Sequence, residues 1–422
     1  MKFVHAADLH LDSPLRGLER YEGAPVERIR GATRRAMENL VELCIDEDVA
    51  FLLLAGDVYD GDWKDYSTGL FFSTQMSRLR EAGVRVFLIR GNHDAQSQIA
   101  KHLHLPDNVI ELSTREPQTK RIESLGVAVH GQGFKRREVT EDLAAQYPAA
   151  EPDAFNVGLL HTALGGRVGH EPYAPCTVET LRSRGYDYWA LGHVHAREVV
   201  CDDPWIVFPG NLQGRHARET GPKGASLVEV RSGRVAAVEH RALDVVRWER
   251  LAVDASGAAT ADDVVDLVRA ALQDAVEGAD GRLVAARLEV VGASRAHDAL
   301  LGDAERWENT LRAQAIDVGP DAVWVEKVRL GTRPVIDLDE VLARDDAVGE
   351  LLRAVRQARE GGPVLDALAA ELSELARKLP REAREGEDGV RPDDPAYLRE
   401  ALDDVERMIL PRLMSVHEDG GR

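Results

Sequence analysis

Short apolar runs that end abruptly in polar clusters recur along the first half of the chain. The clearest one covers residues 84–89 and is followed at once by Arg-Gly-Asn-His-Asp at residues 90–94. An apolar run of this length that ends at a glycine predicts a buried β-strand. Ligands of open α/β sheets bind beyond the carboxyl ends of the strands, so we expect Asn92 and His93 to reach a binding site.

The same pattern predicts a parallel sheet covered by helices. Apolar runs predict strands at residues 2–7, 51–55, 125–130, 155–160, 186–191 and 205–208. Apolar residues at helical spacing predict helices at residues 26–45 and 67–82. Strands that alternate with helices are typical of parallel sheets. Two alternating segments, residues 225–231 and 234–241, flank Ser232-Gly233 and predict a closing hairpin.

The pattern changes after residue 245, and three regions are predicted: 1–245, 246–333 and 334–422. In the middle region, expected strands near residues 247–253, 282–291 and 323–330 alternate with expected helices near 261–276 and 304–315. In the last region, five leucines between Leu365 and Leu379 are spaced by three and four residues, which predicts a helix with one apolar seam. A charged segment near residues 380–395 predicts a linker before a final helix.

Composition supports a folded, multidomain protein. The 422 residues are 44% hydrophobic and 30% charged, as in globular proteins, and the length predicts more than one domain. The first residues form no apolar signal segment and no run approaches the roughly 20 residues of a membrane span, so we expect a cytoplasmic location without membrane contact. Cys44, Cys176 and Cys201 lack paired spacing and are expected to be reduced thiols.

The net charge of −20 argues against a broad basic surface for nucleic acid. Bound divalent cations would invert the field locally, however, so the charge does not exclude such a substrate. Twelve of the fourteen histidines precede residue 241, which concentrates candidate ligands in the first region. We interpret five of these as surface or core histidines, namely His5, His102, His104, His130 and His170.

The polar clusters after five predicted strands form a candidate metal site. They contribute Asp8 and His10, Asp57 and Asp60, Asn92 and His93, His161, and His193 and His195. Side chains two residues apart in an extended segment point the same way, so Asp8 with His10, and His193 with His195, are each able to close on one ion. Nitrogen and oxygen ligands without thiolate suit Mn²⁺, Fe²⁺ or Zn²⁺. Seven of these nine side chains as metal ligands would be too many for one ion and would fit two ions that share a carboxylate.

The order of these motifs resembles that of the calcineurin-like metallophosphoesterases. The motifs are Asp-x-His, Gly-Asp-x-x-Asp, Gly-Asn-His-Asp, a single histidine after a strand, and Gly-His-x-His, and they span residues 8–195. Asp-Leu-His-Leu at residues 8–11 and Arg-Gly-Asn-His-Asp at residues 90–94 resemble the DNA-repair nuclease branch, which includes SbcD and YhaO-like nuclease subunits. The resemblance implies an α/β fold, a β-sandwich flanked by helices (αββα), followed by a small α/β capping domain and a helical tail.

The resemblance also implies roles for individual residues. One metal would be held by Asp8, His10, Asp57 and His195, and the second by Asp57, Asn92, His161 and His193, with Mn²⁺ the expected ion at both. Two-metal sites of this kind place the ions ~3.5–4 Å apart. His93 would protonate the leaving oxygen and Asp60 would orient it, although some nucleases of this branch carry a histidine in place of Asp60. Expected substrate contacts are Arg90, Asn211, Arg215 and His216.

The function implied is a 3′→5′ DNA exonuclease, with single-strand endonuclease activity, in double-strand break repair. The partners implied are DNA and an SMC/RecF-like ATPase that docks on the region 334–422, while the region 246–333 caps the site. The branch also implies a homodimer through the helix around residues 71–79, where Phe71, Phe72, Met76 and Leu79 offer apolar surface unless they pack on the sheet. Tyr59, Trp63 and Tyr66 are either DNA contacts or packing residues.

Two other functions stay open at this point. A small-molecule phosphodiesterase or phosphatase would use the same metals, and the acidic charge favours it, but it does not require the region after residue 245. A scaffold that recruits an ATPase through the helical tail would need no metal ligands, so the ligand set argues against it.

Overall fold

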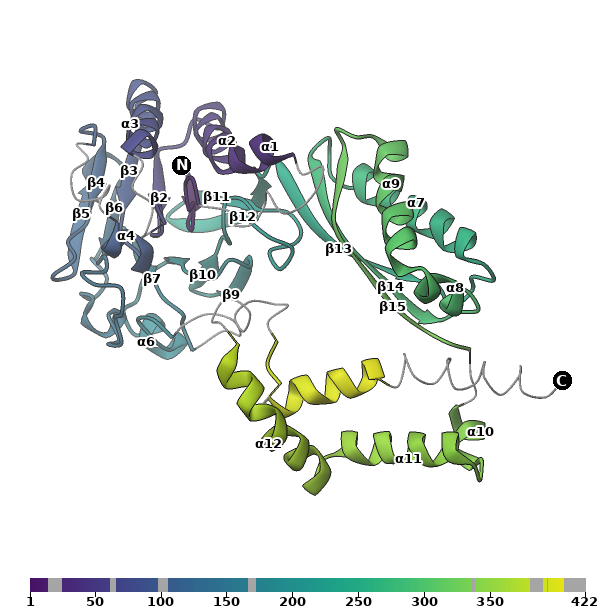
Figure 1. Cartoon of the computed structure of the whole chain (residues 1–422). Coiled ribbons are helices and arrows are strands. Elements are labelled where there is room, and N and C mark those ends of the chain that lie inside the picture. Colours follow the sequence, from purple (N-terminus) through teal and green to yellow (C-terminus); the bar gives the residue numbers. More distant parts are fainter. Residues whose placement is uncertain are drawn as a thin grey trace. The chain divides into compact units, whose positions relative to one another are not determined.

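The structure, a computed structural model, describes residues 1–13, 25–60, 66–97, 105–165, 172–335, 338–379, 390–392 and 394–405. The N-terminal region contains two six-stranded sheets (Figure 1). The first has the order β12-β11-β1-β2-β3-β4 and the second the order β5-β6-β7-β8-β10-β9. The strands of the first sheet are β1 (Lys2–Ala6), β2 (Phe51–Leu54), β3 (Arg85–Leu88), β4 (Val109–Glu111), β11 (Gly224–Arg231) and β12 (Arg234–Ala242). Those of the second are β5 (Gln118–Ile122), β6 (Val127–Gly131), β7 (Phe155–His161), β8 (Tyr188–Gly192), β9 (Glu198–Asp202) and β10 (Trp205–Phe208).

Helices accompany these sheets. They are α1 (Val26–Arg30), α2 (Ala32–Asp46), α3 (Tyr66–Glu81), the short α4 (Asn92–Gln96) and α6 (Val178–Arg182), with 3₁₀ turns η2 (Glu123–Leu125) and η3 (Ala144–Gln146). Successive side chains of a strand alternate between faces. Phe3, Phe51 and Phe87 therefore pack between the sheets, whereas the neighbouring Val4 and Leu52 pack with α2 and α3. The predicted αββα sandwich is confirmed.

Parallel pairing brings the strand ends of each sheet to one edge. In the first sheet, β1 pairs in parallel with β2, and β2 with β3. In the second, β7 pairs in parallel with β8. The segments after β1 and β2 continue this pairing, because His10 N donates to Asp57 O at 3.0 Å and Leu11 N donates to Val58 O at 2.9 Å. The polar clusters therefore emerge side by side.

The strands and helices predicted for the middle region lie close to their expected positions. A three-stranded sheet has the order β13-β14-β15, with β13 (Val246–Asp254), β14 (Leu283–Ala293) and β15 (Val323–Arg333), accompanied by α7 (Ala261–Glu277), α8 (His297–Gly302) and α9 (Ala304–Val318). In the described residues that follow, α10 (Leu338–Ala343), α11 (Ala347–Glu360) and α12 (Pro363–Lys378) are helices, and residues 395–405 are helical as well. The chain divides into two compact units, one formed by residues 1–251, 272–287 and 315–327, the other by residues 252–271, 288–314 and 328 onward. The predicted boundaries near residues 245 and 333 stay a prediction.

Some elements differ from expectation. Strands β4, β5 and β9 were not predicted; β4 and β5 lie at the open edges of their sheets and β9 at the other edge of the second sheet, so none carries a long apolar run. Within α12, Leu365 is buried but Leu375 is exposed. Most of the predicted linker, the end of the last helix, Trp63, His102, His104 and His170 lie outside the described residues.

Most of the apolar side chains of α3 that were expected to form a dimer surface pack inside the protein. Phe72, Met76 and Leu79 are buried in the core against the sheet, so the packing alternative holds for them, and Phe71 is partly buried there too. The exposed apolar residues of α3 are Tyr66 and Leu70. In the part of the chain that the structure describes, no helix is long and apolar enough to span a bilayer.

Candidate metal centre

The backbone is turned sharply at several candidate ligands. Asp8, His10, Asp57 and His193 have φ angles of 52°, 44°, 52° and 100°. Positive φ is uncommon for residues other than glycine, costs on the order of 1–3 kcal/mol for each residue, and clusters at functional sites. These segments are therefore not extended strands. The rule that side chains two residues apart point the same way does not hold there by itself, so the positions of the ligand atoms decide which residues can share an ion.

The members of one pair, Asp8 and His10, lie in the same group of possible ligands, whereas His193 and His195 lie in different groups. Ligand atoms of Asp8, His10 and His195 lie within 4.8 Å of one another and form the first group. His193 instead joins Asp57 and His161 in a second group. The backbone at His193 has a positive φ, and its ring belongs to a different group from that of His195, so Gly-His-x-His serves both groups.

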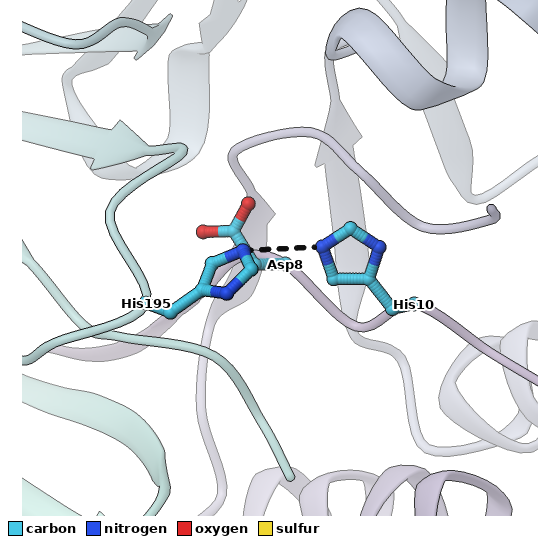
Figure 2. Close-up of side chains that lie close together, drawn as sticks. All are labelled: Asp8, His10 and His195. Atoms are coloured by element: carbon cyan, nitrogen blue, oxygen red, sulfur yellow. Dashed lines mark hydrogen bonds between the residues drawn. The ribbon is translucent and has the colours of Figure 1, made fainter. Parts of the chain in front are cut away.

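In the first group, the Nε2 atoms of His10 and His195 lie 3.3 Å apart (Figure 2). The Nδ1 of His10 lies 2.7 Å from Asp60 Oδ1, and the Nδ1 of His195 lies 2.7 Å from Glu219 Oε1. A carboxylate only accepts hydrogen bonds, so each Nδ1 carries the proton and each Nε2 presents a lone pair. Two facing lone pairs beside Asp8 repel one another unless a cation lies among them.

The second group has the same character. His161 Nδ1 donates to Ala55 O at 2.9 Å, which leaves its Nε2 as an acceptor. That nitrogen lies 2.9 Å from Asn92 Oδ1 and 3.5 Å from Asp57 Oδ2. Three acceptors thus converge without a donor among them, again the arrangement of a cation site. The nitrogen and oxygen donor set fits a divalent ion such as Mn²⁺, Fe²⁺ or Zn²⁺.

Asp57 lies between the two groups. Its Oδ2 is 3.5 Å from His161 Nε2 and 4.0 Å from His10 Nε2, while its Oδ1 accepts the backbone N–H of His93 at 2.9 Å. Burial raises the pKa of both Asp57 and Asp8, and for Asp8 the nearby charge of Asp57 adds to the effect. Cations bound in both groups would offset this repulsion and stabilise the ionised carboxylates.

His93 differs from the buried ligands because its side chain is 36% exposed. Its Nδ1 lies 3.3 Å from Asp60 Oδ1, the oxygen that also contacts His10. Burial opposes ionisation of Asp60, but the His10 ring and the guanidinium of Arg215 lower the pKa of Asp60 below its ordinary value. A negative Asp60 therefore orients both rings, one toward the ligand groups and one at the open side of the site.

Of the four expected substrate contacts, Arg90 lies apart from the other three. Arg90 forms an ion pair with Glu111. Asn211 is fully buried and its Nδ2 donates to Glu219 Oε2 at 3.0 Å. Arg215 Nη2 donates to Glu219 Oε1 at 3.1 Å, and the half-exposed His216 lies 3.7 Å from the same oxygen. Three of the four therefore surround Glu219.

Two acidic residues of the site were missed by sequence reasoning. Glu219, which holds His195, follows no strand and belongs to no recognised motif, so nothing in the pattern marked it. Asp94 ends a motif, but no role was predicted for it. Its carboxylate accepts the backbone N–H groups of Tyr59 at 2.9 Å and Gly91 at 3.1 Å, and burial together with the charge of Asp57 raises its pKa to about 7. Asp94 thereby ties two site loops together.

Two motif glycines allow the loops to approach closely. A Cβ on Gly192 would lie 2.0 Å from Ala55 O, and one on Gly91 would lie 2.2 Å from Asp57 Oδ1. No side chain fits at such distances, so glycine is required at both positions. Gly192 lies where the two sheets meet, and Gly91 lies where two neighbouring strands of the first sheet end.

Comparison with known proteins agrees with this geometry. Residues 1–197 match the family model of the calcineurin-like phosphoesterases, and residues 248–333 match that of the metallophosphoesterase YhaO middle domain. The uncharacterized metallophosphoesterase YhaO of Bacillus subtilis is 38% identical over 262 residues, which cover 61% of this chain and 64% of YhaO. The match therefore spans less than two thirds of the length of YhaO.

Two more distant relatives are DNA double-strand break repair proteins named Mre11. That of Methanopyrus kandleri is 26% identical over 444 residues, covering 97% of this chain and 86% of the relative. That of Haloferax volcanii is 26% identical over 269 residues, covering 64% and 57%. The chain therefore contains a calcineurin-like metallophosphoesterase domain and is homologous to YhaO and to the Mre11 proteins, as its motifs indicated.

Proposed function

We propose that this protein is a metal-dependent DNA nuclease that hydrolyses phosphodiester bonds, acting as a 3′→5′ exonuclease and as a single-strand endonuclease. The observation that carries the proposal is the pair of ligand groups that share Asp57 and lie beside the exposed His93. The choice of DNA is supported by the similarity to Mre11 of Methanopyrus kandleri over 97% of this chain.

The residues divide into metal ligands and a proton donor. Asp8, His10 and His195 would hold one divalent ion, and Asn92, His161 and His193 the other, with Asp57 shared between them. Bound there, the ions would polarise the phosphodiester and provide an activated water at neutral pH, with Mn²⁺ the proposed metal. His93 faces Asp60 through Nδ1, so its Nε2 is the atom that would hold a proton for the departing sugar oxygen.

The proposed partners follow from the relatives and the exposed surfaces. The relative from Methanopyrus kandleri is a DNA double-strand break repair protein, and from this we infer DNA as substrate and an SMC/RecF-like ATPase as partner. The exposed Val364 and Leu375 of α12 are candidate contacts for that ATPase. The exposed Tyr66 and Leu70 of α3 are candidate contacts of a homodimer. A monomeric mass by light scattering would contradict the proposed homodimer. We also propose that the protein is cytoplasmic and associated with the nucleoid.

A second candidate is a phosphodiesterase or phosphatase for small nucleotides. It would use the same ligand groups, and the net charge of −20 favours it, because a broadly acidic protein repels long polyanions. A scaffold without catalysis is disfavoured by the two convergent ligand groups, which a docking protein does not need.

The deciding experiment is cleavage of 3′- and 5′-labelled duplex and hairpin DNA with Mn²⁺, with wild type beside His93→Ala. We expect products that shorten from the 3′ end, and their loss in the variant while two metals remain bound. His240→Ala on β12 is a matched control that leaves cleavage unchanged. Loss of metal in His93→Ala would contradict the assignment of His93 as proton donor.

The same preparation distinguishes the two candidate functions. Turnover of bis-p-nitrophenyl phosphate and nucleotides without any DNA cleavage would overturn the nuclease and support the small substrate. Fewer than two metals per chain by elemental analysis, with no turnover of any phosphodiester, would support the scaffold instead.

A further inference from the structure

The first ligand group has a matched pair of buried supports. Asp60 Oδ1 accepts from His10 Nδ1, and Glu219 Oε1 accepts from His195 Nδ1, each at 2.7 Å. Both carboxylates are buried, with exposed fractions of 9% for Asp60 and 7% for Glu219. Each imidazole of this group is therefore oriented by a carboxylate that sets the position of its proton.

Arg215 lies between these two supports. Its Nη2 donates to Glu219 Oε1 at 3.1 Å, and its Nη1 lies 3.8 Å from Asp60 Oδ1. The Arg215 side chain is only 15% exposed. A planar guanidinium with fixed donor directions can hold two carboxylates in a set geometry, which a lysine cannot do equally well. One arginine thus links the supports of both histidines.

Glu219 is held firmly by further donors. Its Oε2 accepts the backbone N–H of Arg215 at 2.8 Å and the Nδ2 of Asn211 at 3.0 Å. With Arg215 Nη2 and His195 on Oε1, both carboxylate oxygens have two partners. A buried carboxylate with four partners cannot rotate without breaking hydrogen bonds, so the direction of the His195 ring is set by Glu219.

The second ligand group is supported differently. The Nδ1 of His161 donates to a main-chain oxygen, Ala55 O, at 2.9 Å, so through that nitrogen the ring is oriented by the main chain. The consequence is an asymmetry between the groups. Changes in the buried charged network act on His10 and His195 but leave the main-chain support of His161 in place.

We propose that Glu219 and Arg215 are positioning residues for one metal ion only, the ion of the group Asp8, His10 and His195. Glu219 holds the His195 proton at Nδ1 and so leaves Nε2 as the ligand atom. Arg215 holds Glu219 and Asp60 in register, and its charge offsets theirs. The inference rests on the metal centre of the proposed function but not on DNA as its substrate.

The test measures metal affinity rather than activity. Isothermal titration of Mn²⁺ into metal-free protein is compared for wild type, Glu219→Gln and Arg215→Met. We expect two binding events in wild type, and in each variant a 10- to 100-fold weaker affinity for one ion, which is the usual effect of removing the carboxylate behind a histidine ligand. The other ion should keep its affinity.

Glu111→Gln is the matched control, because Glu111 also forms an ion pair with an arginine, Arg90, but contacts neither histidine. We expect both affinities to be unchanged in this variant. Far-UV and near-UV circular dichroism in EDTA verify that each variant is folded. Glu219→Gln removes one of the two carboxylates beside Arg215. The double variant Arg215→Met/Glu219→Gln removes the cation and this carboxylate together and is titrated in the same way.

The outcomes separate positioning from a general structural role. Selective weakening of one ion supports the proposal. Equal weakening of both ions, or unchanged affinity for both, in a folded variant would overturn it. Failure of DNA cleavage in wild type with both metals bound would contradict the nuclease function alone and leave this proposal standing.

Discussion

His10 Nε2 and His195 Nε2 lie 3.3 Å apart although 185 positions separate the two residues in the chain. His10 follows β1 of the first sheet and His195 follows β8 of the second, so the facing atoms exist as a pair only when the two sheets have packed. A cation held by both rings would therefore connect the two layers of the sandwich. Metal binding and folding stability should be coupled.

Removal of metal should lower the stability of the protein. A ligand that binds only the folded state stabilises it by about 2.7 kcal/mol at 100 times its Kd. We expect the melting temperature in Mn²⁺ to exceed that in EDTA by several degrees, measured by circular dichroism. Asp57→Asn, which alters the carboxylate between both groups, should abolish most of this difference. Equal melting temperatures of wild type in Mn²⁺ and EDTA would refute the coupling.

Asp60→Asn should weaken both metal binding and phosphodiester cleavage, whereas His93→Gln should weaken cleavage alone. Asp60 Oδ1 lies 2.7 Å from His10 Nδ1 and 3.3 Å from His93 Nδ1, so its charge supports both a ligand and the proton donor. We expect Asp60→Asn to weaken Mn²⁺ binding and to reduce phosphodiester cleavage. His93→Gln should reduce cleavage by ~10²–10⁴-fold with metal content unchanged. Elemental analysis beside kinetics measures both, and normal metal affinity in Asp60→Asn would be inconsistent with its contact to His10.

Gly192→Ala should destabilise the fold at the site. The new Cβ would lie 2.0 Å from Ala55 O, and backbone cannot yield as a flexible side chain does. We expect a loss of about 1–3 kcal/mol, the usual cost of overpacking, together with weaker metal binding. Urea unfolding in EDTA measures the first quantity. Gly257→Ala, where nothing lies within 4 Å of the added Cβ, is the control and should leave stability unchanged; equal stability of both variants would contradict the close approach.

His5 should make folding sensitive to acid. Its ring is buried, with Nδ1 3.0 Å from Tyr188 Oη and Nε2 3.0 Å from Leu191 O, and burial lowers its pKa from the ordinary 6.5 to about 3. Between these values the unfolded chain binds a proton that the folded chain does not. This contribution to stability is complete above pH 6.5 and is lost as pH falls toward 3, by ~1.4 kcal/mol per pH unit.

The His5 prediction is tested by urea unfolding in EDTA at pH 6.5, 5.5 and 4.5. Compared with wild type, His5→Gln should show a shallower fall of the free energy of unfolding, because glutamine keeps hydrogen-bonding capacity but binds no proton. Parallel pH profiles of the two proteins would show that the His5 proton is not excluded by the fold. EDTA removes the contribution of metal binding, which is itself pH-dependent.

Much of the fold could be predicted because its signals are local. The alternation of Phe3 with Val4 and of Phe51 with Leu52 places one face of each strand between the sheets, and a period of two can be read directly from the sequence. Edge strands such as β4 escaped prediction because they bury little and so need no apolar run. The spacing of Phe72 and Met76 on α3 fitted either a dimer surface or packing on the sheet. Only the tertiary structure shows that both are buried.

The sequence by itself determined which residues the site would use, because each candidate ligand directly follows an apolar strand and parallel strands end at one edge. The resemblance to a known family already assigned His193 and His195 to different ions, although their spacing alone would place both on one face of an extended segment. Only the tertiary structure decided the local geometry: the backbone at His193 has a positive φ, a conformation that no residue pattern announces, and the two histidines lie in different groups. Glu219 reaches His195 from 24 positions away, since contacts of that kind depend on how loops pack and not on the spacing of polar and apolar residues.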